Sequence, residues 1–194
     1  MDSYLRLRET LTLFEPLTDA AWADMQSLFQ PGSLKRGDYF VREGAYNYKV
    51  GFILDGALRA YYLDEDGNFY NKTFFVANTF AASLASILQR IPSYLNFDAL
   101  LDTKFLEASY LDIEALFPKH RCLETCVRKL VEYEWVIKKE RRELRLVLND
   151  ATQRYLYFRE EYPGLENQIP QYHIASHLGI TPIQLSRIRS RIKA

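Results

Sequence analysis

The segment 171–190 constrains the fold of this chain more than any other part, because it predicts two short helices joined by a tight turn. It reads QYHIASHLGITPIQLSRIRS. Ala175 is small where a second helix must cross closely, and Gly179 provides the turn. Thr181 is a favourable N-cap residue, and Pro182 follows at the first helical position, where its missing N–H group costs nothing. This pattern is typical of a helix-turn-helix, although a plain helical hairpin is the alternative.

The second helix of this motif is expected to have an inward and an outward face. Leu185, Ile188 and Ile192 point inward in this register. An α-helix fits the major groove of DNA, where the guanidinium of Arg187 can bind guanine and the amide of Gln184 can bind adenine. We therefore expect DNA contacts from a set of residues on or beside the outward face: Gln171, Thr181, Ile183, Gln184, Ser186, Arg187, Ser190 and Arg191.

The distribution of charge agrees with this prediction. The chain has 25 basic and 25 acidic residues, but no acidic residue follows Glu166, whereas four basic residues do. A basic end on an otherwise acidic chain is typical of a nucleic-acid-binding module attached to another domain.

Residues 30–111 predict a compact β domain. Six of the eight glycines lie between positions 32 and 67, separated by short stretches rich in aromatic and β-branched residues. The clearest hairpin joins residues 57–63 to residues 69–76, because Asp66 and Gly67 suit a tight turn between strands. Two short helices are expected before this domain, in residues 1–29.

Residues 112–149 predict a long helix with an apolar stripe. Every seventh residue of the stripe is apolar, which is the spacing of a seam between paired helices. One hypothesis is that the helix pairs with a second copy of the chain, and the alternative is that the stripe packs on its own β domain. The expected interface residues are Leu123, Val127, Leu130, Ile137 and Leu144.

Several classes of protein are excluded by the sequence. The 194 residues suffice for one domain or two small ones, and no apolar run approaches the roughly 18 residues of a membrane span. Residues 1–6 lack the features of a secretory signal, so we expect a cytoplasmic protein without a membrane partner. Cys122 and Cys126 are then expected to be reduced thiols.

We expect neither a metal site nor enzymatic activity. His173 and His177 have the spacing of zinc ligands on a helix, but no third ligand is identifiable. Two cysteines are too few for an iron–sulfur cluster that needs four ligands. No nucleophile-elbow or phosphate-loop motif is present, and the paired carboxylates fall on predicted surfaces, so no catalytic residue is assigned.

The order of these parts resembles that of the Crp/Fnr transcription regulators. Three stretches are similar to the short, Bacteroidetes-type members of that family: LKRGDYFVREG at 34–44, ILDGALRAY at 53–61 and PQYHIASHLGITP at 170–182. The resemblance implies an α+β protein with a cyclic-nucleotide-binding-like β-roll, a parallel homodimer through the long helix, and a helix-turn-helix domain over residues 150–194. That domain would be of the winged-helix type, although too few residues follow Arg187 for the usual wing.

The same resemblance implies a degenerate effector site. Relatives that bind cyclic AMP hold the ribose with the Glu of a Gly-Glu pair and the phosphate with the Arg of an Arg-Ser pair. The corresponding positions here are Ala82-Ser83 and Ser93-Tyr94, and Arg90 lies about three residues out of register. We expect no cofactor, an unknown effector and no binding of cyclic AMP, with a pocket formed by Ala82, Ser83, Arg90, Ser93 and Tyr94.

The reading helix also departs from the family pattern. Relatives that read TGTGA-like sites have Arg, Glu and Arg where this chain has Pro182, Ile183 and Arg187, so the target sequence does not carry over. The sequence predicts a homodimeric regulator whose partners are double-stranded DNA, a second copy of itself and RNA polymerase. The alternative is a small-molecule sensor whose terminal domain contacts protein rather than DNA.

Overall fold

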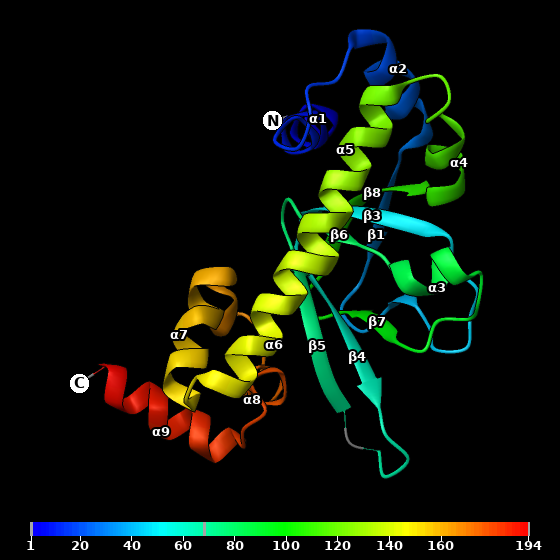
Figure 1. Cartoon of the computed structure of the whole chain (residues 1–194). Helices are drawn as coiled ribbons and strands as arrows, with labels where there is room; N and C mark the ends of the chain where they lie inside the picture. The colour runs from blue at the N-terminus through cyan, green and yellow to red at the C-terminus, as the bar shows by residue number, and fades with distance from the viewer. Residues whose placement is uncertain (1, 68, 194) are drawn as a thin grey trace.

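Two antiparallel four-stranded sheets form the centre of the molecule (Figure 1). The computed structural model describes residues 2–67 and 69–193. One sheet has the strand order β1-β8-β3-β6 and the other the order β2-β7-β4-β5. The strands are β1 (Gln30–Leu34), β2 (Tyr39–Val41), β3 (Lys49–Asp55), β4 (Ala57–Leu63), β5 (Phe69–Val76), β6 (Phe80–Ala81), β7 (Asn96–Ala99) and β8 (Thr103–Ser109).

The two sheets enclose an apolar core that includes Ile53, Leu58 and Phe97, each at most 1% exposed. Strand β3 passes into β4 through Gly56, which has a φ of +89°. A Cβ atom at this position would lie 2.4 Å from the carbonyl oxygen of Asp102, so only glycine allows the chain to turn here. The hairpin predicted from the sequence is confirmed, because β4 and β5 pair from Ala57–Val76 to Leu63–Phe69.

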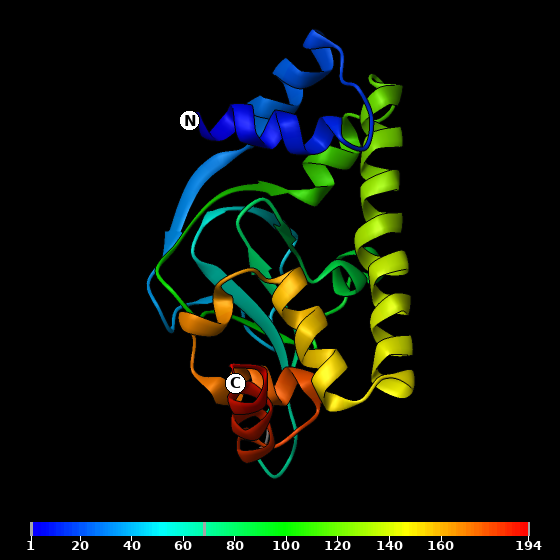
Figure 2. The same cartoon turned by 90° about the vertical axis from the view of Figure 1, so that its left-hand side faces the viewer.

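Helices cover the ends and one side of these sheets. Helices α1 (Ser3–Thr12) and α2 (Asp19–Leu28) begin at side-chain caps from Asp2 and Thr18 and pack at one end of the molecule. Figure 2 shows the C-terminal helices at the opposite end and a long helix alongside the sheets. The remaining short helices next to the sheets are α3 (Leu84–Gln89) and α4 (Tyr110–Ala115).

The long helix begins at Arg121, later than the predicted start at residue 112, because a turn around Pro118 separates it from α4. It consists of α5 (Arg121–Val131), a π-helical segment η1 (Glu132–Ile137) and α6 (Lys138–Leu148). The C-terminal unit follows, with α7 (Ala151–Glu161), a 3-10 turn η2 (Leu165–Asn167), α8 (Gln171–Leu178) and α9 (Pro182–Lys193). No helix of the described residues is both long and apolar enough to cross a membrane.

The π-helical segment divides the apolar stripe of the long helix into two parts. The wider hydrogen-bonding pattern of η1 adds about one residue to a turn, which rotates the following side chains by about 100°. Ile137 and Leu144, which follow this rotation, are 40% and 53% exposed. Leu123, Val127 and Leu130, the other predicted interface residues, are buried in the chain's own core with residues of α1, α2 and the sheet. For these three residues the stripe packs on its own chain, which was the alternative hypothesis.

Candidate functional site

Helices α8 and α9 form a helix-turn-helix. Gly179 ends α8 in the left-handed conformation, with a φ of +66°, and the N–H of Ile180 donates to the carbonyl of Ala175 at 3.0 Å. The side chains of Ala175 and Leu185 are buried where the two helices cross. The local residue types that predict this motif therefore occupy the expected places in it.

The first turn of α9 is stabilised by a reciprocal cap. The backbone N–H of Gln184 donates to Oγ1 of Thr181 at 3.2 Å, and Oε1 of Gln184 accepts from the backbone N–H of Thr181 at 3.0 Å. This cap engages the side-chain oxygen of Gln184, the residue expected to bind adenine. Gln184 can read adenine with that oxygen only if the cap opens.

The outward face of α9 is open to solvent. Figure 1 shows α9 at the outer edge of the molecule, with α8 between it and β5. Ile188 is buried as predicted, but Ile192 is 37% exposed, so its predicted inward position is only partly correct. All eight residues assigned to DNA contact are exposed: Gln171, Thr181, Ile183, Gln184, Ser186, Arg187 and Arg191, together with Ser190.

Helix α8 is held on strand β5 by hydrogen bonds to the backbone. The hydroxyl of Ser176 donates to the carbonyl of Phe69 at 2.8 Å and accepts from the N–H of Asn71 at 3.0 Å. The side-chain amide of Asn71 donates to the carbonyl of His173 at 2.9 Å. These contacts fix the orientation of the helix-turn-helix relative to the β-roll.

A buried guanidinium adds a second connection between the β-roll and α8. Arg59 on β4 forms a bidentate ion pair with Asp98 on β7, at 2.6 and 2.9 Å. Its remaining nitrogen lies 2.8 Å from Nδ1 of His173. Burial, followed by the positive charge of Arg59, lowers the pKa of His173 to about 3, so its neutral ring accepts this hydrogen bond through Nδ1.

His177 is the second buried histidine of α8. Its Nδ1–H donates to the carbonyl of Asn71 at 3.1 Å, and its ring packs among Phe74, Phe158 and Tyr162. Burial, followed by the charge of Arg142, lowers the pKa of His177 to about 3. His173 and His177 therefore connect α8 to strands β4 and β5. No group of three metal-ligating side chains occurs among residues 2–67 and 69–193.

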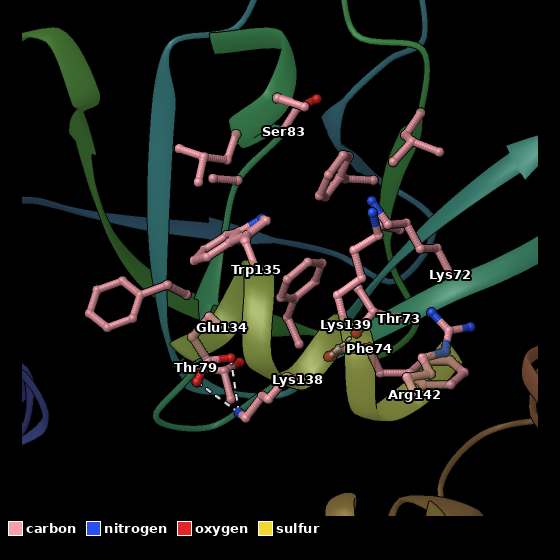
Figure 3. Close-up of a pocket in the computed structure, with 18 of the residues that line it drawn as sticks. Lys72, Thr73, Phe74, Thr79, Ser83, Glu134, Trp135, Lys138, Lys139 and Arg142 are labelled. Atoms are coloured by element: carbon pink, nitrogen blue, oxygen red, sulfur yellow. Dashed lines mark hydrogen bonds and ion pairs between the residues drawn. The ribbon is translucent and has the colours of Figure 1, made fainter. Parts of the chain in front are cut away.

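A cavity of about 150 Å³ lies between the β-roll and the long helix (Figure 3). Three of the five residues predicted for the effector pocket line it, namely Ala82, Ser83 and Tyr94. Ser93 lies behind them, where its hydroxyl is 2.9 Å from that of Ser83. Arg90 is exposed at the left-handed end of α3 and does not line the cavity, so its assignment to the pocket is not supported by the geometry.

The basic and aromatic wall of this cavity was not predicted from the sequence. Figure 3 shows Trp135 in the middle of the lining, with the ends of Lys72 and Lys139 close together and Arg142 on the same side. Lys138 also lines the cavity and is paired with both carboxylate oxygens of Glu134, at 2.7 and 2.9 Å. The basic run KKERR at 138–142, which starts three residues after Trp135, could have indicated this wall from the sequence.

Comparisons with solved structures identify the fold. FixK2 from Bradyrhizobium japonicum aligns with a TM-score of 0.69 at 19% identity, over 85% of this chain and 84% of that chain. A protein of Eubacterium rectale, described as a transcriptional regulator of the Crp/Fnr family, aligns with a TM-score of 0.69 at 15% identity, over 91% and 84%. The chain has the Crp/Fnr fold. No protein-family model and no curated protein sequence matches it.

A third solved structure supports the same assignment of the fold. A third similar structure is CLP of Xanthomonas campestris, a c-di-GMP-responsive global regulator, with a TM-score of 0.66 at 12% identity over 91% of this chain and 92% of that chain. The expected fold class, an α+β chain with a cyclic-nucleotide-binding-like β-roll and a helix-turn-helix, is confirmed.

Proposed function

We propose that this chain is a sequence-specific DNA-binding transcription regulator. The observation that carries the proposal is the geometry of α8 and α9, in which a capped helix with an exposed, basic face projects from the outer edge of the molecule. Arg187 lies on that face, and α9 carries no acidic residue that would oppose DNA phosphates. The proteins of similar fold include transcription regulators, which supports the same reading.

The proposed regulator is a homodimer. Ile137, Leu144 and Leu148 share one side of the second half of the long helix and are 40%, 53% and 73% exposed. Aliphatic side chains at this spacing favour pairing with a second helix, because the pairing removes their apolar surface from water. The interface that we propose therefore lies in the C-terminal half of the helix rather than along the whole predicted stripe.

The β-roll of this regulator would act as a sensor that does not bind cyclic AMP. The positions that hold ribose and phosphate in cyclic-AMP-binding relatives carry Ala82-Ser83 and Ser93-Tyr94, which provide neither a carboxylate nor a guanidinium. A buried phosphate charge would lack a partner on this wall. By the resemblance to Crp/Fnr regulators, RNA polymerase is a further proposed partner and the cytoplasm the proposed site of action.

Selection of bound fragments from random DNA with the purified chain tests the proposal. We expect enrichment of a two-fold symmetric sequence with half-sites about one helical turn apart, which is the spacing that two symmetric reading helices require. Binding to the selected fragment should exceed binding to scrambled DNA by at least about a thousandfold. If no sequence is enriched and nonspecific DNA does not bind at low salt, the terminal domain contacts protein instead and DNA recognition is excluded.

A further inference from the structure

The cavity between the β-roll and the long helix combines apolar walls with a basic side. Its apolar lining includes Phe75, Phe80, Phe97 and Trp135. Its volume of about 150 Å³ is similar to that of cavities that hold a single benzene ring, and is below the roughly 300 Å³ at which pockets for drug-sized ligands begin. The space therefore suits an apolar body of about one ring.

The charges around the cavity are predominantly positive. Four cationic side chains line it against two carboxylates, and both carboxylates are already paired, Glu134 with Lys138 and Glu161 with Arg145. Among the ion pairs of the described residues, none includes Lys72 or Arg142. Neither cation has a carboxylate partner among residues 2–67 and 69–193, although Arg142 donates to the hydroxyl of Tyr70 at 2.9 Å. Lys139 lies 3.6 Å from the carboxylate of Glu143.

Two further observations concern the cations on the basic side of the cavity. Nε of Arg142 is buried and has no hydrogen-bond partner, which is rare for a charged donor. Burial, followed by the like charges of Lys139 and Arg142, lowers the pKa of Lys72 below its usual range. An anion placed between Lys72, Lys139 and Arg142 would offset the repulsion between their charges.

One wall of the cavity comes from an irregular part of the long helix. Glu134 and Trp135 belong to the π-helical segment, and such segments occur often at functional sites. The segment turns Trp135 toward the cavity while Ile137 faces away from the core. The irregular helix therefore places an indole against the same space that the cations surround.

We propose that this cavity binds a small organic anion, with an apolar body of about one ring against Trp135 and the phenylalanines and one acidic group on Lys72, Lys139 and Arg142. The acidic group is a carboxylate or a phosphate ester. The inference rests on the proposed role of the β-roll as a sensor and names the class of its ligand. The anion is held by β5 and the long helix, whereas the wall that carries Ala82 and Ser83 contributes no charge.

Calorimetry with the full chain tests the class of ligand. The probes are phenylacetate, phenyl phosphate, the neutral isostere phenylacetamide, inorganic phosphate and cyclic AMP. At least one of the two aromatic anions should bind at least about tenfold more tightly than phenylacetamide and inorganic phosphate, because only the aromatic anions use both sides of the cavity.

Substitutions of the cations test the location. Lys72→Met with Lys139→Met should weaken binding of the aromatic anion about tenfold and leave that of phenylacetamide nearly unchanged, because only the anion loses its charge partners. Lys104→Met, an exposed lysine on β8 in the other sheet, is the matched control and should change neither affinity. If the double variant folds poorly, Lys139→Met alone is used instead, because Lys139 is exposed and its replacement should not disturb folding. This single variant should also weaken binding of the aromatic anion.

Four outcomes overturn the proposal. They are no binding of either aromatic anion up to about 10 mM, equal binding of anion and amide, equal affinities in wild type and the lysine variants, and tighter binding of cyclic AMP than of the aromatic anions. None of these measurements involves DNA. Failure of the ligand proposal is therefore distinguishable from failure of DNA binding, which the fragment selection reports separately.

Discussion

The guanidinium of Arg59 donates a hydrogen bond of 2.8 Å to Nδ1 of His173, and so joins a central strand of the β-roll to the first helix of the helix-turn-helix. The two residues are 114 positions apart in the sequence. Asp98 holds the other side of the same guanidinium, so the three residues form one buried polar network. The orientation of α8, and through it of α9, therefore depends on the charge state and geometry of a site inside the β-roll.

Arg59→Leu should destabilise the chain strongly. The substitution leaves the carboxylate of Asp98, which is 8% exposed, without its partner, and removing one member of a buried ion pair costs about 3–5 kcal/mol. Urea unfolding measures the loss. Lys35→Leu, which removes the exposed pair with Asp102, should have a much smaller effect, and equal losses in the two variants would contradict the importance of burial.

Acid should loosen the chain through the two histidines of α8. Their pKa values of about 3 in the folded chain lie below the ordinary value of 6.5, so the unfolded chain binds more protons between these limits. The stability contributed by the neutral rings is complete above pH 6.5 and decreases as the pH falls toward 3, by up to about 1.4 kcal/mol per pH unit for each histidine.

The free energy of unfolding, measured between pH 4.5 and 7 by urea titration, checks this expectation. His173→Asn with His177→Gln should make the pH dependence shallower, because neither replacement titrates in that window. A double variant with the same slope as the wild type would show that other groups dominate the acid response.

Leu144→Asp should produce a folded monomer. Leu144 is 53% exposed in the single chain, so an aspartate there is tolerated by the monomer but unfavourable in an apolar interface between two copies. Leu130→Asp, in contrast, places a charge in the chain's own core and should prevent stable folding.

Sedimentation and thermal unfolding of both variants distinguish these effects. A wild type that is already monomeric at tens of micromolar would contradict dimerisation. A Leu144→Asp variant that remains dimeric would place the interface elsewhere on the surface.

The parts of this structure that local residue types determine could be predicted from the sequence. Asp66 and Gly67 allow the hairpin turn, and Gly179 and Thr181 define the helix-turn-helix, because each acts on its own backbone. The division of the apolar stripe could not be predicted, since the seven-residue spacing continues unchanged through the π-helical segment and nothing local marks it.

The cavity was only partly predictable for a related reason. Ala82 and Ser83 were expected from the resemblance to Crp/Fnr regulators, and both line the cavity. Lys72 and Trp135 line the same cavity because the long helix packs next to β5. The sequence pattern of either segment alone does not predict this packing. Arg90 was assigned from its nearness in sequence, but it is exposed at the end of α3 and is not among the residues that line the cavity.

Arg187→Ala should weaken binding to a selected operator more than binding to scrambled DNA. Arg187 is exposed on the outward face of α9, and the buried neighbours Leu185 and Ile188 hold the opposite side of the helix, so the direction of its side chain is defined by the core. A bidentate contact to guanine contributes about 1–3 kcal/mol of discrimination between sequences.

The matched control for Arg187→Ala is Arg191→Ala, one turn later on the same helix and also exposed. If Arg191 contacts a phosphate, its loss should weaken binding to both DNAs equally and reduce the slope of log affinity against log salt by about one unit. Fluorescence anisotropy with both variants, on the operator and on scrambled DNA at several salt concentrations, separates the two roles. Equal losses on the two DNAs for Arg187→Ala would exclude base reading by Arg187 and assign it to the phosphate backbone, because a phosphate contact carries no information about sequence.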